Sequence, residues 1–142
     1  MLNITGFDTE SPKHQSFELP GARPHYTPDR PGQVEHIALD LNLEIDQQRY
    51  TGTCTIRLTP IRNGIERLVL DAVNLHIEAV MVGNLAQTFD HDGEQLQVSL
   101  NQPTRINQPI DIAIAYRSDN PQRGLYFVAP TTHEPDKPTQ VW

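Results

Sequence analysis

Histidines are the residues of this sequence with the clearest capacity for chemistry, because imidazole binds metals and transfers protons near neutral pH. Zinc hydrolysis on a helix requires two histidines one turn apart, with a glutamate between them that activates the metal-bound water. No two histidines here are closer than 11 residues. We therefore predict that the chain holds no metal ligand. The six positions are His14, His25, His36, His76, His91 and His133.

The densest polar cluster is Asp90-His91-Asp92-Gly93. A calcium-binding loop needs further alternating oxygen ligands and a glutamate at its far end, and both are missing from this segment. Aspartate and glycine are also the residues that tight turns prefer. The cluster is thus predicted to be a hairpin turn and not a cation site.

Nucleophiles are the remaining source of chemistry. Cys54 shares its alternation phase with Ile56 and Leu58, so we expect its thiol to face the core, where it acts as a small apolar group. No serine is flanked by the glycines of a nucleophile elbow, and no glycine-rich phosphate loop follows a strand. We predict no catalytic and no cofactor-binding residue. The serines considered are Ser11, Ser16, Ser99 and Ser118.

The elements that would position such residues are strands. Residues 34–46 alternate apolar and polar side chains with a period of two, which is typical of a half-buried strand. Residues 50–59 repeat the alternation with threonines on the outer side, and the two runs predict an antiparallel hairpin.

Further short apolar runs are separated by turn residues, and none has helical spacing. Asn63-Gly64 and the segment 90–93 mark turns. The count of seven to eight strands predicts an all-β fold, an antiparallel β-sandwich. The remaining predicted strands are 65–71, 75–81, 86–89, 95–100, 110–116 and 124–128, and 139–142 resembles the beginning of another.

The first 33 residues differ from the rest in composition. They contain five prolines, which fix φ and remove hydrogen-bond donors, so we expect an extended arm and not a domain. Irregularly spaced apolar residues predict a strap laid over the body. These anchors are Phe7, Phe17, Leu19 and Tyr26. Residues 34–142 are predicted to form one sandwich domain.

Composition limits the partners of the chain. A net charge of −7 with only two lysines leaves no basic stripe for a nucleic acid. No apolar stretch reaches the length of a membrane span or signal peptide, and Cys54 has no second cysteine to pair with. We therefore expect a cytoplasmic protein with no nucleic-acid or membrane partner.

Several segments, taken in order, resemble the amino-terminal domain of the zinc aminopeptidases that include alanyl aminopeptidase and leukotriene hydrolase, the gluzincins. The resemblance covers about residues 34–142 and implies a saddle-like β-sandwich. In the opening hairpin, an aromatic residue, one position and a glycine begin the second strand, as in Tyr50-Thr51-Gly52. The segments that carry it are 36–43, 50–56, 68–72, 75–77, 112–116 and 123–126.

The same resemblance bears on the end of the chain. The family continues with a Thr/Ser-Gln-x-Glu/Gln segment that helps to bind the substrate's amino group. Thr139-Gln140-Val141-Trp142 begins like it, but Trp142 stands where an acid or amide belongs, so the role is not transferred to Gln140. The substrate loop, the zinc helix and the oxyanion tyrosine of the family are missing. We expect the domain to be truncated at its C-terminal end.

By resemblance, the parent protein is a zinc metallo-aminopeptidase that removes amino-terminal residues from peptides. The chain alone would then be no enzyme. It would act as a scaffold and as one wall of the active-site cleft, with the catalytic domain of the same polypeptide as its partner and zinc held by the parent. The alternatives are a free-standing β-sandwich module that binds proteins or carbohydrates, and a non-catalytic aminopeptidase-like scaffold.

Overall fold

The computed structural model describes residues 30–142, so nearly all of the predicted arm lies outside the described residues. Within this range the chain forms strands and one short 3-10 turn, with no α-helix. The all-β prediction is confirmed. The elements are β1 (Gly32–Glu44), η1 (Ile45–Gln47), β2 (Arg49–Pro60), β3 (Arg67–Asp71), β4 (His76–Val82), β5 (Leu85–Ala86), β6 (Thr88–His91), β7 (Gln95–Ser99), β8 (Ile110–Asp119), β9 (Phe127–Val128) and β10 (Gln140–Val141).

The predicted hairpin is present as β1 and β2, which pair antiparallel along their whole length. The turn between them is η1, and Gln48 closes it in the left-handed region with φ 52° while its N–H donates to the carbonyl of Ile45 at 3.1 Å. Ile45 therefore belongs to the turn, although the alternation placed it in the strand. The hairpin continues into a five-stranded sheet with the order β1-β2-β8-β4-β5.

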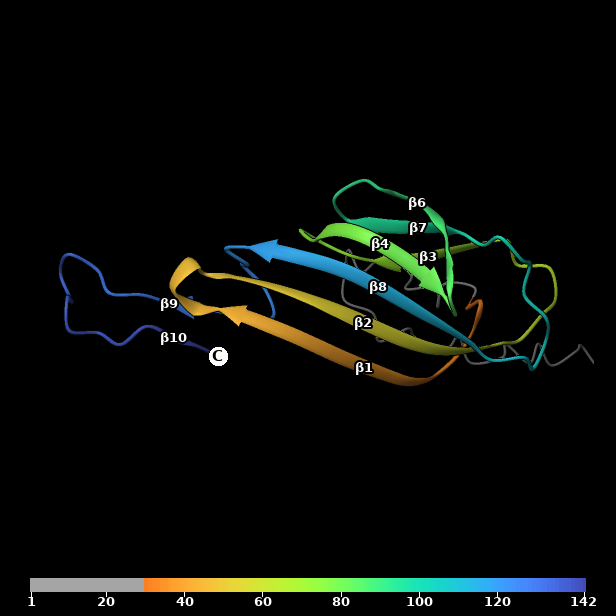
Figure 1. The fold of residues 1–142 in the computed structure, drawn as a ribbon, viewed down its shortest axis with the longest axis horizontal. Coiled ribbons are helices and arrows are strands. Elements are labelled where there is room, and N and C mark those ends of the chain that lie inside the picture. The colour runs from red at the N-terminus through yellow and green to blue at the C-terminus, as the bar shows by residue number, and fades with distance from the viewer. Residues whose placement is uncertain (1–29) are drawn as a thin grey trace, which may run out of the picture.

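A second sheet, with the order β3-β7-β6, packs on part of the first. Figure 1 shows β6 and β7 beside β4, while β1 lies at the opposite edge of the five-stranded sheet. The core between the sheets combines side chains from both layers, which confirms the predicted sandwich. Its largest fully buried apolar side chains are Leu68, Leu96, Ile112, Val80 and Val98.

The alternation of β4 is interrupted, which the sequence did not predict. The expected apolar phase was Leu75, Ile77, Ala79 and Met81. The pairing with β8 shifts between Ile77 and Ala79, so a bulge moves the chain by one residue. Val80 thus becomes the core residue, 1% exposed, beside Ile77.

The predicted strand 86–89 is two strands. Leu85 and Ala86 pair with β4 in the five-stranded sheet, whereas Phe89 pairs with Val98 in the other sheet. Gln87 lies at the crossing and is buried. Its Nε2 donates to the carbonyl of Leu85 at 2.8 Å, and its Oε1 accepts from the N–H of Asn101 at 2.8 Å. A buried polar side chain with both groups satisfied stabilises the crossing.

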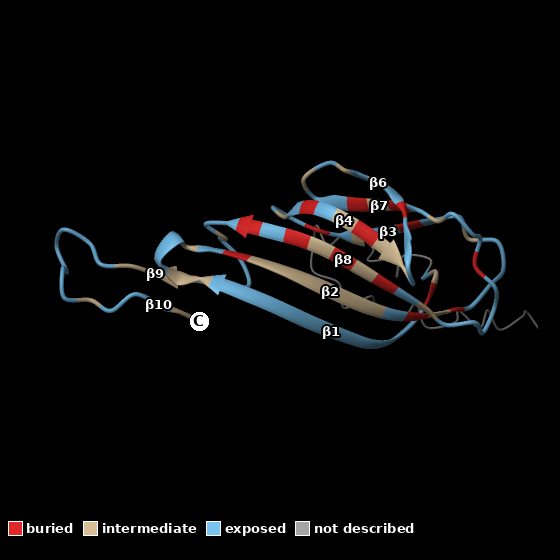
Figure 2. Ribbon diagram, viewed as in Figure 1, coloured by how far each residue is buried: buried red, intermediate tan, exposed pale blue. Residues whose placement is uncertain are grey.

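The predicted half-burial of β1 is wrong. Its inward apolar residues share the core face of the sheet, because Leu39 pairs with Cys54 and Cys54 pairs with Ile114. Leu39 is nevertheless 61% exposed. Figure 2 shows β1 pale blue almost throughout, whereas β8 carries buried residues. The three-stranded sheet does not extend over β1, so the alternation marks a face without a cover.

The chain ends in a small hairpin of β9 and β10 that extends beyond the body of the sandwich (Figure 1). Tyr126 and Trp142 exchange backbone hydrogen bonds at 2.7 and 3.1 Å. The predicted strand at 139–142 is thus present as Gln140–Val141, and its partner is the short strand expected at 124–128.

Candidate functional site

The described histidines lie apart from one another. His36 is on the exposed edge strand, His76 is at the exposed start of β4, and His133 is in the exposed loop before β10. His91 is half-buried, and its Nε2 lies 2.8 Å from the carbonyl oxygen of Ala72, to which it can donate. A histidine held by a backbone carbonyl in this way fixes a hairpin to its neighbour. His14 and His25 lie outside the described residues.

The Asp92 carboxylate closes the turn between β6 and β7. Its Oδ1 accepts from the N–H groups of Glu94 and Gln95 at 2.8 and 2.6 Å. These backbone hydrogen bonds, that from Gln95 first, lower the pKa of the Asp92 carboxyl below its usual value. Asp90 and His91 belong to β6. The predicted hairpin turn is therefore confirmed, with its tip at Asp92 and Gly93, where Gly93 has a φ of 98°.

Cys54 packs against the core, as predicted, but remains half-buried. Burial raises the pKa of its thiol, which disfavours the thiolate that a nucleophile needs. Ser118 is buried at the end of β8, and Ser99 is exposed on β7. Ser11 and Ser16 lie outside the described residues.

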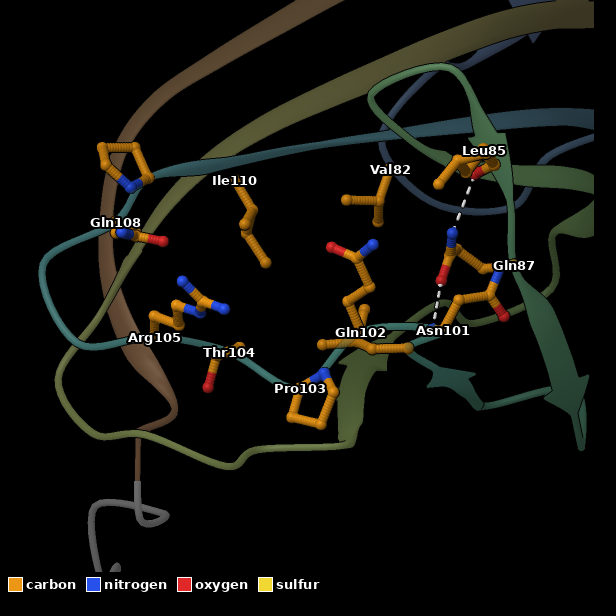
Figure 3. A pocket seen from close by; sticks show the side chains of 12 residues that line it. Val82, Leu85, Gln87, Asn101, Gln102, Pro103, Thr104, Arg105, Gln108 and Ile110 are labelled. Atoms are coloured by element: carbon orange, nitrogen blue, oxygen red, sulfur yellow. Dashed lines mark hydrogen bonds between the residues drawn. The ribbon is translucent and has the colours of Figure 1, made fainter.

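A pocket of about 340 Å³ with both polar and apolar lining opens beside the loop between β7 and β8. Figure 3 shows Gln102 and Arg105 extending from this loop into the space next to Val82 and Ile110. The sequence analysis missed this pocket; its signal is the run of amide residues between 101 and 108.

The pocket has donors but no acid or base for catalysis. Amide and guanidinium groups do not exchange protons near neutral pH. The one hydroxyl, of Thr104, already donates to the carbonyl of Arg62 at 3.1 Å and accepts from the N–H of Ile65 at 3.0 Å. The pocket can therefore hold a small polar group by hydrogen bonds, and its residues lack the means to transform it.

An accessible apolar area lies on β1 and around its beginning. Residues on the core face of this strand are between 37% and 61% exposed. Contiguous apolar area of this kind on a protein surface marks a contact site. The exposed residues of this area are Val34, Ile37, Leu39, Leu41, Leu43, Ile61 and Val69.

A second apolar area lies at the opposite end, on the C-terminal hairpin. The rings of Tyr126 and Trp142 lie 6.0 Å apart between centroids with an angle of 43° between their planes. Trp142 is 73% exposed and Tyr126 is 50% exposed. Tyr50 and Tyr116, by contrast, are buried in the core.

The part of the chain that the structure describes contains no cluster of metal ligands and no membrane-spanning helix. Residues 30–142 bring no three His, Cys, Asp or Glu side chains together in a geometry that could hold an ion. The same residues form no helix long and apolar enough to cross a bilayer.

A known protein family matches most of the chain. The sequence profile of the Peptidase M1 N-terminal domain matches residues 23–141. No curated protein matches the chain.

Similar solved structures are M1 zinc metallopeptidases. One is a mutant from Deinococcus radiodurans bound to a Tyr-Ser-Ala substrate, with a TM-score of 0.57, 19% identity, and coverage of 63% of this chain and 21% of that chain. Another is a two-domain mutant bound to L-arginine, with a TM-score of 0.56, 18% identity, and coverage of 75% of this chain and 29% of that chain. At such identities the likeness shows the fold.

The chain thus spans between 21% and 29% of the length of these two metallopeptidases. The profile match covers most of the sequence and includes all the strands that residues 30–142 form. This chain belongs to the Peptidase M1 N-terminal domain family.

Proposed function

We propose that this chain is the non-catalytic amino-terminal domain of a zinc-dependent aminopeptidase, which removes amino-terminal residues from peptides. The observation that carries the proposal is the family match over residues 23–141. The chemistry of the described residues supports it, because they offer no activated nucleophile and no cluster of metal ligands.

The zinc of the parent enzyme would not be held by residues 30–142. Zinc in proteins takes cysteine, histidine or carboxylate ligands, usually in a set of three or four. The described histidines are separated on different elements, and Cys54 lies on the core face of β2 with a raised thiol pKa. We place the metal in the catalytic domain of the same polypeptide.

The role of the chain is then structural. We propose that it packs against the catalytic domain and forms one wall of the active-site cleft, where it limits how peptides enter. The C-terminal hairpin supports this role, because it extends from the sandwich and carries the exposed pair Tyr126 and Trp142 (Figure 1). Aromatic side chains are enriched where proteins pack against one another.

The test starts from the gene. We expect the reading frame to continue beyond Trp142 into a Gln-x-Glu segment, a Gly-x-Met-x-Asn loop and a His-Glu-x-x-His helix. The full product should release arylamine from aminoacyl arylamides in a zinc-dependent manner. A stop codon after Trp142 in the native gene would instead favour the free-standing binding module.

The isolated chain provides the matched control. We expect purified residues 1–142 to release no arylamine and to bind zinc no more tightly than an unrelated protein of equal histidine content. Zinc-dependent arylamine release by this chain alone would overturn the assignment of a non-catalytic role.

A further inference from the structure

The loop between β7 and β8, residues 100–109, contains a short repeat. Asn-Gln-Pro occurs at residues 101–103 and again at residues 107–109, and Arg105 lies midway between Gln102 and Gln108. A residue that precedes proline is restricted to extended backbone conformations, so both glutamines have little backbone freedom. The loop therefore presents one guanidinium group with an amide on either side of it.

The backbone of this loop is fixed at its centre. The N–H of Thr104 donates to the carbonyl of Ile65 at 3.0 Å, and the carbonyl of Thr104 accepts from the N–H of Gly64 at 2.8 Å. The N–H of Ile106 donates to Asn63 Oδ1 at 2.7 Å. Thr104 is also buried, with 4% of its surface exposed. A ligand that binds to the side chains of this loop thus has little backbone to order, which favours binding.

Three side chains of the loop have polar groups that the fold leaves unused. Gln102, Arg105 and Gln108 line the pocket of about 340 Å³, and their side chains form no hydrogen bond or ion pair with residues 30–142. Figure 3 shows them around one hollow. The other two amides of the lining are used, because Gln87 Oε1 accepts from the N–H of Asn101 at 2.8 Å and Asn101 Nδ2 donates to a carbonyl of β5 at 2.9 Å. The unused donors are therefore accessible to a ligand.

The charge of the pocket is positive. Arg105 is the one charged residue among the described residues that line it. By contrast, Arg49, Arg57 and Arg117 each lie between 2.7 and 3.9 Å from a carboxylate oxygen. A guanidinium group binds a carboxylate through two parallel hydrogen bonds, and amide N–H groups can donate to the lone pairs that remain. This side of the pocket therefore fits a carboxylate.

The opposite side of the pocket is aliphatic. Val82, Leu85 and Ile110 contribute to it from β4, β5 and β8. A ligand whose carboxylate lies on Arg105 would place its carbon chain against these side chains, where apolar surface is removed from water. The volume is near the lower end of the range of small-molecule pockets, about 300–1,000 Å³. The ligand is therefore small, and it combines a carboxylate with a short aliphatic group.

We propose that this pocket binds a small aliphatic carboxylate, with Arg105 as the charged contact and Gln102 and Gln108 as flanking donors. A free branched-chain acid and the carboxyl end of a peptide with an aliphatic last residue both carry this chemistry. The inference goes beyond the proposed role in an aminopeptidase and does not rest on it, because it depends on residues of the β7–β8 loop and of the sheet alone.

NMR titration of the full 142-residue chain tests the proposal, with isovalerate as the free acid and N-acetyl-leucine as the peptide-like ligand. We expect saturable shifts of the Val82, Leu85 and Ile110 methyl signals, with a Kd of about the millimolar order for ligands with so few atoms. The methyl signals of Val128 on β9 should not move. The tighter of the two ligands identifies the source of the carboxylate. No saturable shift with either ligand would overturn the proposal.

Two further ligands test the chemical class. N-acetyl-leucinamide has the same aliphatic group without the charge, so it should bind at least about tenfold more weakly than N-acetyl-leucine. Inorganic phosphate has the charge without the aliphatic group and should also bind more weakly than either acid. Equal affinity for the amide or for phosphate would overturn the assignment to an aliphatic carboxylate.

Matched substitutions locate the site. Arg105→Gln should weaken N-acetyl-leucine binding at least about tenfold, and Gln108→Ala should weaken it about two- to tenfold. Arg123→Gln is the control, since Arg123 is also exposed but lies in the loop before β9. It should leave the Kd unchanged, and an equal loss in both arginine variants would reject a specific site. The methyl spectra without ligand show whether each variant is folded. None of these measurements uses zinc or peptidase activity, so their failure leaves the proposed function untouched.

Discussion

The β1 edge and the centre of the five-stranded sheet share one apolar pattern but have opposite surroundings. Ile37, Ile56 and Ile112 form one row across β1, β2 and β8. Ile37 is 54% exposed, Ile56 is half-buried, and Ile112 is 1% exposed. The residue type is identical along the row, so the difference comes from the three-stranded sheet, which covers β8 and stops short of β1 (Figure 2).

The alternation of apolar and polar residues thus has different results on the two strands. On β8 it builds the core that holds the domain together, and on β1 it leaves an exposed apolar face. The outer side of the same sheet is polar on both strands and carries exposed ion pairs, such as Arg57 with Glu35 and with Asp111, each at 3.9 Å. Exposed pairs of this kind add little to stability. The covered part of the apolar face is therefore the main source of stability.

The largest expected effect comes from truncating a leucine in the covered half. Leu96→Ala should lower the free energy of unfolding by about 2–5 kcal/mol, because Leu96 is 1% exposed and its loss leaves a cavity. Leu39→Ala, the same substitution on β1, should change it by no more than about 0.5 kcal/mol. Urea unfolding of both variants measures the difference. Equal losses would contradict the contrast between the two halves.

A glycine on β2 gives the next largest effect. A Cβ at Gly52 would lie 2.5 Å from Leu41 Cδ2 and 2.8 Å from the carbonyl oxygen of Asp40. Gly52→Ala should therefore destabilise the chain by about 1–3 kcal/mol. Adding Leu41→Ala should recover part of this loss, because the side-chain clash disappears while the backbone clash remains. Urea unfolding of the single and double variants tests this; full tolerance of Gly52→Ala would show that β1 does not pack closely on β2.

The tendency of the chain to self-associate tests the exposed β1 face directly. We expect the isolated chain to associate with increasing concentration through its exposed β1 edge, since unpaired apolar edge strands favour pairing. Leu39→Asp should shift the sedimentation profile toward monomer, and Leu85→Asp should not. A strictly monomeric parent chain at high concentration would refute this expectation.

The smallest effect concerns pH and the turn at Asp92. Because its pKa is lowered from 3.8 in the folded chain, the ionised carboxylate stabilises the fold above that value, and the contribution is lost as pH falls through the lower folded pKa. Asp92→Ala should slightly reduce stability at neutral pH and flatten the decline below about pH 4. Thermal unfolding between pH 2 and pH 7 gives the comparison, with Asp90→Ala as the control on the neighbouring strand. An unchanged acid decline in Asp92→Ala would assign it to other carboxyls.

Most strands could be predicted from the sequence, because period-two alternation and turn residues are local signals. The features of the fold that could not be predicted share a different cause. The bulge near Ala79 and the crossing at Gln87 depend on pairing with distant strands, β8 for the first and both sheets for the second. A window along the chain contains no information about such partners.

The features of the candidate site also divide into those with local sequence signals and those that depend on distant strands. Residue types and their spacing were enough to show that the sequence has no catalytic motif and that it resembles a known family. The pocket beside Arg105 could not be predicted, because it forms where the loop from β7 to β8 passes Val82 and Leu85 from elsewhere in the sheet. The exposed pair Tyr126 and Trp142 likewise depends on the pairing of β9 with β10.

By itself, the sequence determined the alternation of the strands, the turns at Gly64 and Gly93, and the lack of a nucleophile or metal motif, because each depends on the chemistry of neighbouring residues. Only the tertiary structure decided which part of each apolar row across the sheet is covered by a second layer. Burial requires a second layer, and the three-stranded sheet reaches β8 but not β1. The exposed β1 face therefore results from the extent of one sheet over another.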